Sequence, residues 1–123
     1  IDGCDQTTPL RASNSDVTGV TTTANSLLSS IVVGDICIGG GGTRDITGGN
    51  TTHNNGWTED FDVTNADGGS FIGGHKIAAA TSETYSLSYP TATDQATAAI
   101  ALAQTSGAQS ATLMGGKCIY IMP

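Results

Sequence analysis

The sequence has few charged residues, and very few of them are basic. Charged residues make up 12% of the chain, whereas about 25% is usual in soluble domains. Four Lys and Arg stand against eleven Asp and Glu, which gives a formal net charge of -7. Nucleic-acid binding requires basic residues that displace counterions from phosphates, and anionic membranes attract basic segments. The composition therefore excludes a nucleic-acid partner and disfavours binding to a membrane surface.

Long apolar runs and the common metal and catalytic motifs are also missing. No apolar run approaches the roughly 20 residues of a membrane span. Cys4, Cys37 and Cys118 form no CxxC pair, which disfavours zinc. A Cys4–Cys118 disulfide would join the two ends of the chain, whereas Cys37 fits a buried thiol in an apolar strand. His53 and His75 accompany no GxSxG nucleophile motif, so we expect no catalytic residues and no enzyme activity.

Thr, Ser, Asn and 17 Gly take the place of the missing charges. Thr is β-branched and suits a half-exposed strand, so this composition is typical of a β-rich protein on an extracellular or virion surface. A length of 123 residues fits one domain. We expect an N-terminal arm over residues 1–12 and a single domain over residues 13–123.

Strands are predicted from period-two alternation and from turn residues. Tyr85, Leu87 and Tyr89 alternate with serines, which predicts a strand that ends at Pro90. A short buried strand is predicted over residues 36–38, ended by the glycine run over residues 39–42.

The Ala-rich segment over residues 95–104 fits a helix by propensity and a buried strand by alternation. The all-β context favours the strand. Residues 117–122 complete a set of seven to nine short strands. The prediction is therefore an all-β fold, a two-sheet antiparallel β-sandwich or jelly roll.

An acidic cluster precedes and enters a predicted hairpin turn. Asp60 and Asp62 lie on a strand, and Asn65 and Asp67 lie in the turn. Asn and Asp favour such turns for conformational reasons, which is the leading interpretation. Calcium binding by these four residues is the alternative, because calcium takes six to eight oxygen ligands. No other cofactor is expected.

Two features suggest carbohydrate. Asn50-Thr51-Thr52 is an N-glycosylation pattern. Trp57 follows the polar loop and could stack on a sugar ring, whereas Tyr85 and Tyr89 alternate with Leu87 and fit the core better.

Several short motifs occur in a recognisable order. These are a Gly-Asp turn with an aliphatic strand over residues 34–38, Gly56-Trp57, HKIAAATSE from His75, Tyr85-Ser86-Leu87-Ser88, and DQATAAIALA from Asp94. This order resembles a recurring β-sandwich domain of phage structural proteins and bacterial extracellular proteins. The resemblance covers a little over half of the chain, and the chain departs from the family pattern in its three cysteines and in its final strand. It implies a non-enzymatic domain displayed on particles or outside cells, and it carries over no catalytic residue.

We therefore expect a structural subunit that assembles in many copies on a virion, as a decoration, tail or fibre protein, or in an extracellular filament. Its partners would be copies of itself, by exchange of the N-terminal strand over residues 1–12, and other virion or surface proteins. The alternative is a glycan-binding adhesion module, with an exposed aromatic platform near Trp57.

Overall fold

The structure of the chain is a computed structural model, which describes residues 7–44, 51–65, 68–104, 113–114 and 117–118. Its elements are β1 (Leu10–Ser29), β2 (Ile36–Thr43), β3 (Thr52–His53), β4 (Thr58–Thr64), β5 (Ser70–Ile77), β6 (Ser82–Leu102), β7 (Leu113–Met114) and β8 (Lys117–Cys118). The described ranges contain strands and no helix, which confirms the all-β class. Accordingly, no described helix is long and apolar enough to cross a membrane.

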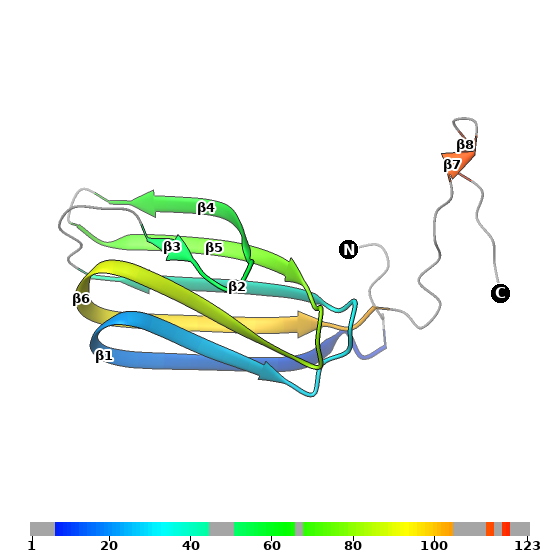
Figure 1. Ribbon diagram of the computed structural model, residues 1–123, viewed down its shortest axis with the longest axis horizontal. Coiled ribbons are helices and arrows are strands. Elements are labelled where there is room, and N and C mark those ends of the chain that lie inside the picture. The colour runs from blue at the N-terminus through cyan, green and yellow to red at the C-terminus, as the bar shows by residue number, and fades with distance from the viewer. Residues whose placement is uncertain (1–6, 45–50, 66–67, 105–112, 115–116, 119–123) are drawn as a thin grey trace.

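Six of the strands form one continuous antiparallel sheet. Their order is β1-β6-β2-β5-β4, with β3 paired to β6, while β7 and β8 pair with each other. β1 and β6 are 20 and 21 residues long, and both bend back on themselves (Figure 1). The sheet therefore folds over into two layers that share these two strands, and the predicted arrangement of two separate sheets is not confirmed.

The two layers are defined by the pairing of β1 with β6. In the five-stranded layer, Leu10–Thr18 pairs with Gln95–Leu102, and β2, β5 and β4 follow. In the three-stranded layer, Thr23–Ser29 pairs with Ser82–Ser88, and β3 follows. Most of each layer is thus covered on one side by the other layer.

Pro90 does not end its strand, contrary to the sequence-based prediction. β6 continues through it to Leu102. The β1–β6 ladder runs to the pair Thr23–Ser88 and resumes at Thr21–Thr93 after a register shift. Pro90 stands in this gap, where its missing N–H group removes no ladder hydrogen bond. The proline therefore marks the bend of β6 and not its end.

The core lies between the two layers. Its largest fully buried side chains include Tyr85 and Leu87 from the three-stranded layer and Ile72 from the five-stranded layer. A buried hydrogen bond of 2.8 Å joins Ser26 Oγ and Thr97 Oγ1 across the core. The alternation of Tyr85, Leu87 and Tyr89 thus faces inward, as the sequence predicted.

The glycine run also differs from its prediction, because β2 continues through Gly39–Gly42 to Thr43. A Cβ atom on Gly39 would collide with the ring of Tyr85, and one on Gly41 would collide with Leu87 Cδ1. The run therefore supplies a flat inner surface on which the large side chains of the other layer pack.

The Ala-rich segment is a strand, as the all-β context favoured. It forms the second half of β6 and pairs with β1 on one side and β2 on the other. Ala99, Ala101 and Ala103 are buried, whereas Ala98 is exposed. Central position in the sheet, and not helix propensity, decides its conformation.

The predicted N-terminal arm is partly built into the sheet. Leu10 and Ala12 pair with Leu102 and Ala101 of the same chain, and Pro9 O accepts a 2.8 Å hydrogen bond from Ala103 N. Residues 10–12 are thus already paired within the chain and are not free to exchange alone. Residues 1–6 lie outside the described residues.

Candidate functional site

The predicted acidic cluster surrounds an irregularity in β4. Glu59 pairs with Gly74 and Phe61 pairs with the adjacent Gly73, which leaves Asp60 as an extra residue in a β-bulge. The bulge changes the alternation of the side chains. The sequence suggested that Asp60 and Asp62 share one face of a regular strand, but the bulge at Asp60 interrupts that strand.

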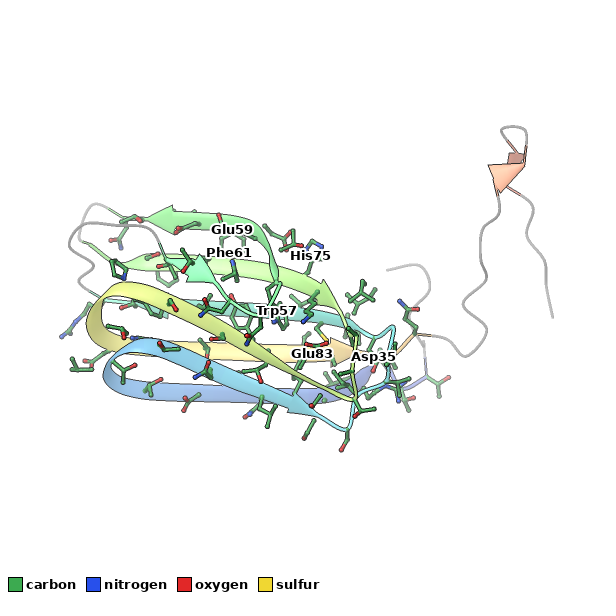
Figure 2. The ribbon with its side chains drawn as sticks, viewed as in Figure 1. Asp35, Trp57, Glu59, Phe61, His75 and Glu83 are labelled. Atoms are coloured by element: carbon green, nitrogen blue, oxygen red, sulfur yellow. The ribbon has the colours of Figure 1, made fainter. Side chains whose placement is uncertain are left out.

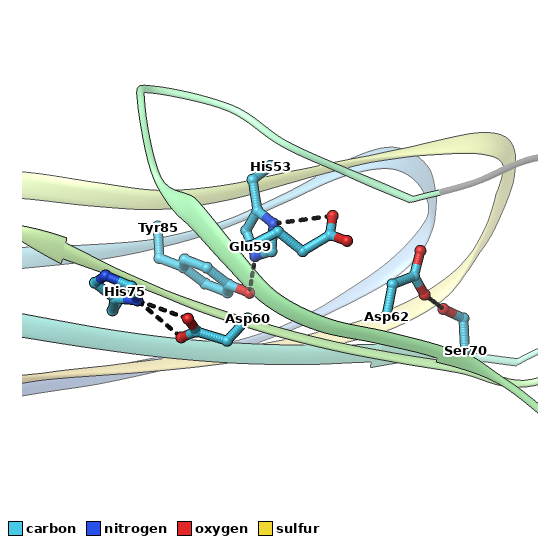
Figure 3. A network of polar contacts seen from close by, with 7 residues as sticks. All are labelled: His53, Glu59, Asp60, Asp62, Ser70, His75 and Tyr85. Carbon is cyan, nitrogen blue, oxygen red and sulfur yellow. Dashed lines mark hydrogen bonds and ion pairs between the residues drawn. The ribbon is translucent and has the colours of Figure 1, made fainter.

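Each described residue of this cluster has its own partner (Figure 3). Both carboxylate oxygens of Asp60 lie 2.8 and 2.9 Å from Nδ1 of His75. Asp62 Oδ1 accepts a 3.2 Å hydrogen bond from Ser70 Oγ. The described part of the chain holds no group of three or more His, Cys, Asp or Glu side chains that could bind a metal ion.

Asn65 closes the turn between β4 and β5. Its Oδ1 accepts a 2.7 Å hydrogen bond from Gly69 N, and its carbonyl oxygen accepts a 3.1 Å hydrogen bond from Gly68 N. Gly68 has a φ of 87°, which favours glycine. These bonds are the turn chemistry that the sequence favoured. Asp67 lies outside the described residues, and calcium binding stays a prediction.

His53 lies on β3 and points into the core beside Tyr85. His53 Nε2 is 2.9 Å from Tyr85 Oη, and the two rings are tilted by 54° at a centroid distance of 5.5 Å. The other ring nitrogen, Nδ1, lies 3.6 Å from Glu59 Oε2, which is too long for a hydrogen bond. The His53 side chain is only 3% exposed, so it offers no open face to a substrate.

Trp57 is also part of the core and not of the surface. It is 6% exposed, packs edge-on against Tyr85 at a centroid distance of 4.7 Å, and donates a 2.9 Å hydrogen bond from Nε1 to Thr84 O. In Figure 2 the Trp57 label lies among the strands in the middle of the domain. This position argues against the predicted aromatic platform for sugar at Trp57.

Burial raises the pKa of one thiol and two phenols in the core. Desolvation by burial, followed by the charges of Glu83 and Asp35, raises the pKa of the Cys37 thiol to about 11. Burial also raises the pKa of the Tyr85 phenol, and it raises that of Tyr89 to about 12. A thiol reacts as the thiolate, so Cys37 behaves as a small buried apolar residue at neutral pH.

The remaining predicted residues fall at the limits of the description. Asn50 and Cys4 lie outside the described residues, and of Cys118 only the backbone of β8 is described. Within the glycosylation pattern, Thr51 is buried and Thr52 is exposed at the start of β3. Glycosylation at Asn50 and the Cys4–Cys118 disulfide stay predictions.

A feature that the sequence interpretation missed is the outer face of the five-stranded layer, the side turned away from the core. The residues of its first cross-strand row, from β1 to β4, are Val17, Ala96, Gly42, Phe71 and Val63. The residues of the second row are Ser15, Ala98, Gly40, Gly73 and Phe61. Neither row contains a charged residue.

The outer face carries large apolar side chains in contact with solvent. Val17 is 83% exposed, Phe71 is 58% exposed and Phe61 is 52% exposed. Between Val17 and the two phenylalanines, the small residues of β6 and β2 leave a groove of about 780 Å³. Soluble monomers rarely expose contiguous apolar patches of more than a few hundred Å², so this groove is the candidate functional surface.

A sequence signal for this surface existed. Phe61 and Val63 lie on either side of Asp62, and Phe71 is followed directly by the apolar Ile72. Alternation shows that two residues share a face, but it does not show which face meets the core. Alternation puts Trp57, Phe61 and Val63 on one face of an edge or partly exposed strand. The structure places β4 at the edge of the sheet, buries Trp57 and exposes Phe61 and Val63.

Comparison with family models, curated proteins and solved structures found no match to this chain.

Proposed function

We propose that this chain is a non-catalytic structural subunit that assembles in many copies, on a virion as a decoration, tail or fibre protein or in an extracellular filament. The outer face of the five-stranded layer carries this proposal. Val17 and Phe71 are more than half exposed there, and no charge interrupts the two rows around them. Burial of such a surface against another protein is strongly favourable.

The rest of the described structure supports a building role. The described chain is all-β, with two layers that share β1 and β6, and this supports a building role of the kind that the sequence resemblance implies. Its polar pairs, such as Asp60–His75, Lys76–Glu83 and His53–Tyr85, connect strands to each other. They stiffen the domain without gathering around one hollow.

The glycan-binding alternative receives less support. Sugar sites combine an exposed aromatic ring with several hydrogen-bonding groups. Trp57 is buried, and the two rows of the outer face contain a single polar side chain, that of Ser15. An apolar protein partner fits this surface better than a hydroxyl-rich ligand.

The proposal is tested by the assembly state of the purified chain. Sedimentation velocity over a range from micromolar to near-millimolar concentration, together with negative-stain electron microscopy, should show association into regular multimers. A chain that remains monomeric throughout, with no ordered particle in the micrographs, would contradict the proposal. Binding to a glycan array by such a monomer would favour the adhesion module instead.

A further inference from the structure

Bulky and small side chains are distributed unevenly across the outer face. β2 is the central strand of the five-stranded layer, with β6 and β1 on one side and β5 and β4 on the other. The β2 and β6 positions of both rows are Gly or Ala. The β5 and β4 side carries the two phenylalanines and Val63, and the β1 end of the first row carries Val17. A ridge of large side chains thus lies beside a floor of small ones.

This distribution is complementary to itself under a two-fold rotation. If the axis lies in the interface and runs along β2, the rotation places β5 of one copy over β6 of the other, and β4 over β1. Phe71 then faces Ala96 and Phe61 faces Ser15, while Gly40 and Gly42 face their own equivalents at the axis. Both phenylalanines thus meet small residues, Gly73 faces Ala98, and Val63 faces Val17 at the edges.

We propose that two copies of this chain pack face to face through this outer face, about a two-fold axis along β2. The inference rests on the proposed function and names the surface that the assembly uses. Aligned sheets pack with their strands about 30° apart and with side chains interdigitated. An interface of this kind is isologous, because the same patch serves both copies.

The area of the patch fits a stable pair. Four large exposed residues of the two rows are Val17, Phe61, Val63 and Phe71, between 52% and 83% exposed, and Ile38 and Ile77, 37% and 53% exposed, continue the same face beyond the second row, beside the Asp60–His75 pair. Together they present on the order of 600 Å² of apolar surface, if a fully buried aromatic side chain contributes about 150–250 Å². A standard interface buries about 800 Å² on each partner. The floor of the groove and a surrounding rim would supply the rest of this buried area.

The charge distribution favours a second copy over the other possible occupants. The chain carries a formal net charge of -7, yet the two rows contain no charged residue. Asp16, Arg44 and Asp94 also line the groove, outside the two rows, so the charges of two copies would lie beside the two rows and not within them. An anionic lipid surface would be repelled by the rest of the molecule. A strand added to a sheet edge would bind β1 or β4 through the backbone and would leave this face uncovered.

The test uses one substitution at two matched positions of β1. Val17 is 83% exposed on the outer face, and Val20 is 71% exposed at the bend of β1, outside the groove. Val17→Lys should weaken self-association in sedimentation equilibrium by on the order of tenfold or more, because the lysine charge would be buried against an apolar copy. Val20→Lys should leave association within about twofold of the unsubstituted chain, because its side chain stays in solvent.

A cross-link tests the symmetry. Gly40 lies at the proposed axis, and a Cβ atom there has only ordinary contacts, the nearest at 3.7 Å from Ile72 O. Face-to-face sheets lie about 10 Å apart, too far for a direct disulfide, so Gly40→Cys should give a dimer with a short bismaleimide linker, in excess of the background from the natural cysteines. Val20→Cys, which is also exposed, should give only that background. Circular dichroism confirms that each variant is folded before it is compared.

The outcomes separate this inference from the proposed function. Ordered multimers from both the unsubstituted chain and Val17→Lys, with no Gly40→Cys cross-link above background, would overturn the docking surface and leave the structural role intact. An equal loss of association in Val20→Lys would also overturn it. A monomeric unsubstituted chain would overturn both the surface and the structural role.

Discussion

Replacement of Gly39 by alanine should destabilise the fold, whereas the same replacement at Gly40 should not. The two residues are adjacent on β2, at the start of the glycine run. A Cβ atom on Gly39 would collide with three atoms of the Tyr85 ring. Tyr85 is fully buried, in edge-on contact with Trp57, and hydrogen-bonded to His53, so the ring cannot move aside without disturbing the core.

The magnitude follows from overpacking. A methyl group forced into a well-packed core costs about 1–3 kcal/mol, and the lower entropy of the unfolded alanine chain returns about 0.4–1 kcal/mol. We expect Gly39→Ala to lose on the order of 1–2 kcal/mol. In a domain of 123 residues that loss lowers Tm by about 3–12 °C. Gly40→Ala, with its nearest contact at 3.7 Å, should be neutral or slightly more stable.

Urea and thermal unfolding, followed by circular dichroism at low concentration, measure both variants. Gly19→Ala is a further control. A Cβ atom on Gly19 has nothing within 4 Å, so this alanine should not disturb the packing. If Gly39→Ala unfolded at the same urea concentration as Gly40→Ala and Gly19→Ala, Tyr85 would not be packed on the glycine run. The described arrangement of the two layers would then be refuted.

Three further predictions follow from buried or paired groups. Burial opposes ionisation of Glu83, but its hydrogen bonds from Lys76 Nζ at 2.7 Å and from Ala79 N lower its pKa overall. Because its pKa is lower in the folded chain, ionised Glu83 stabilises the fold above the unfolded pKa of about 4.3, and this stabilisation is lost as pH falls through the folded pKa. Glu83→Gln should therefore flatten the decline of Tm between about pH 5 and pH 3, and an unchanged slope would contradict the pairing. Cys37 should resist maleimide in the folded chain at pH 8 and react after denaturation, as read by peptide mass spectrometry, and rapid labelling of the native chain would contradict its burial. Millimolar calcium should leave Tm unchanged, because Asp60 and Asp62 already have partners; a rise that EGTA reverses would instead support the calcium site.

Period-two alternation was sufficient to predict the strand class and part of the core. Tyr85, Leu87 and Tyr89 are all buried, as expected, although Ser86 between them is buried as well. Turn residues were equally informative at Asn65 and at Gly34, which has a φ of 100°. These signals are local, since each depends only on residues within a few positions of one another.

The errors arose where distant residues decide the structure. Glycine normally weakens a strand, so the run at Gly39–Gly42 was interpreted as a strand end. Its continuation in β2 depends on Tyr85 and Leu87, more than 40 residues later in the sequence. Pro90 was misinterpreted for a similar reason, because only the register shift against β1 shows that its N–H group was not needed.

The outward position of Phe61 and Phe71 has the same physical origin. The large rings of the three-stranded layer fill much of the space between the layers, so several inner positions of the facing strands, Gly39, Gly41 and Gly74 among them, must be small. A Cβ atom on Gly74 would already collide with Thr58 O, and the ring of His53 lies close by. With the inner side occupied, the aromatic residues of β4 and β5 are accommodated on the outside, where alternation alone cannot place them.

The glycine run therefore acts on both sides of one strand. Gly39 and Gly41 face inward and receive Tyr85 and Leu87, while Gly40 and Gly42 face outward and form the floor of the groove. Substitution on the inner side should change the free energy of unfolding, and substitution on the outer side should change association with other copies. If both kinds of residue affected only stability, the outer glycines would be explained by the fold alone. If instead the inner substitutions changed the free energy of unfolding and the outer substitutions changed association, a partner surface would have to pack against the outer side of β2 as closely as the core packs against its inner side.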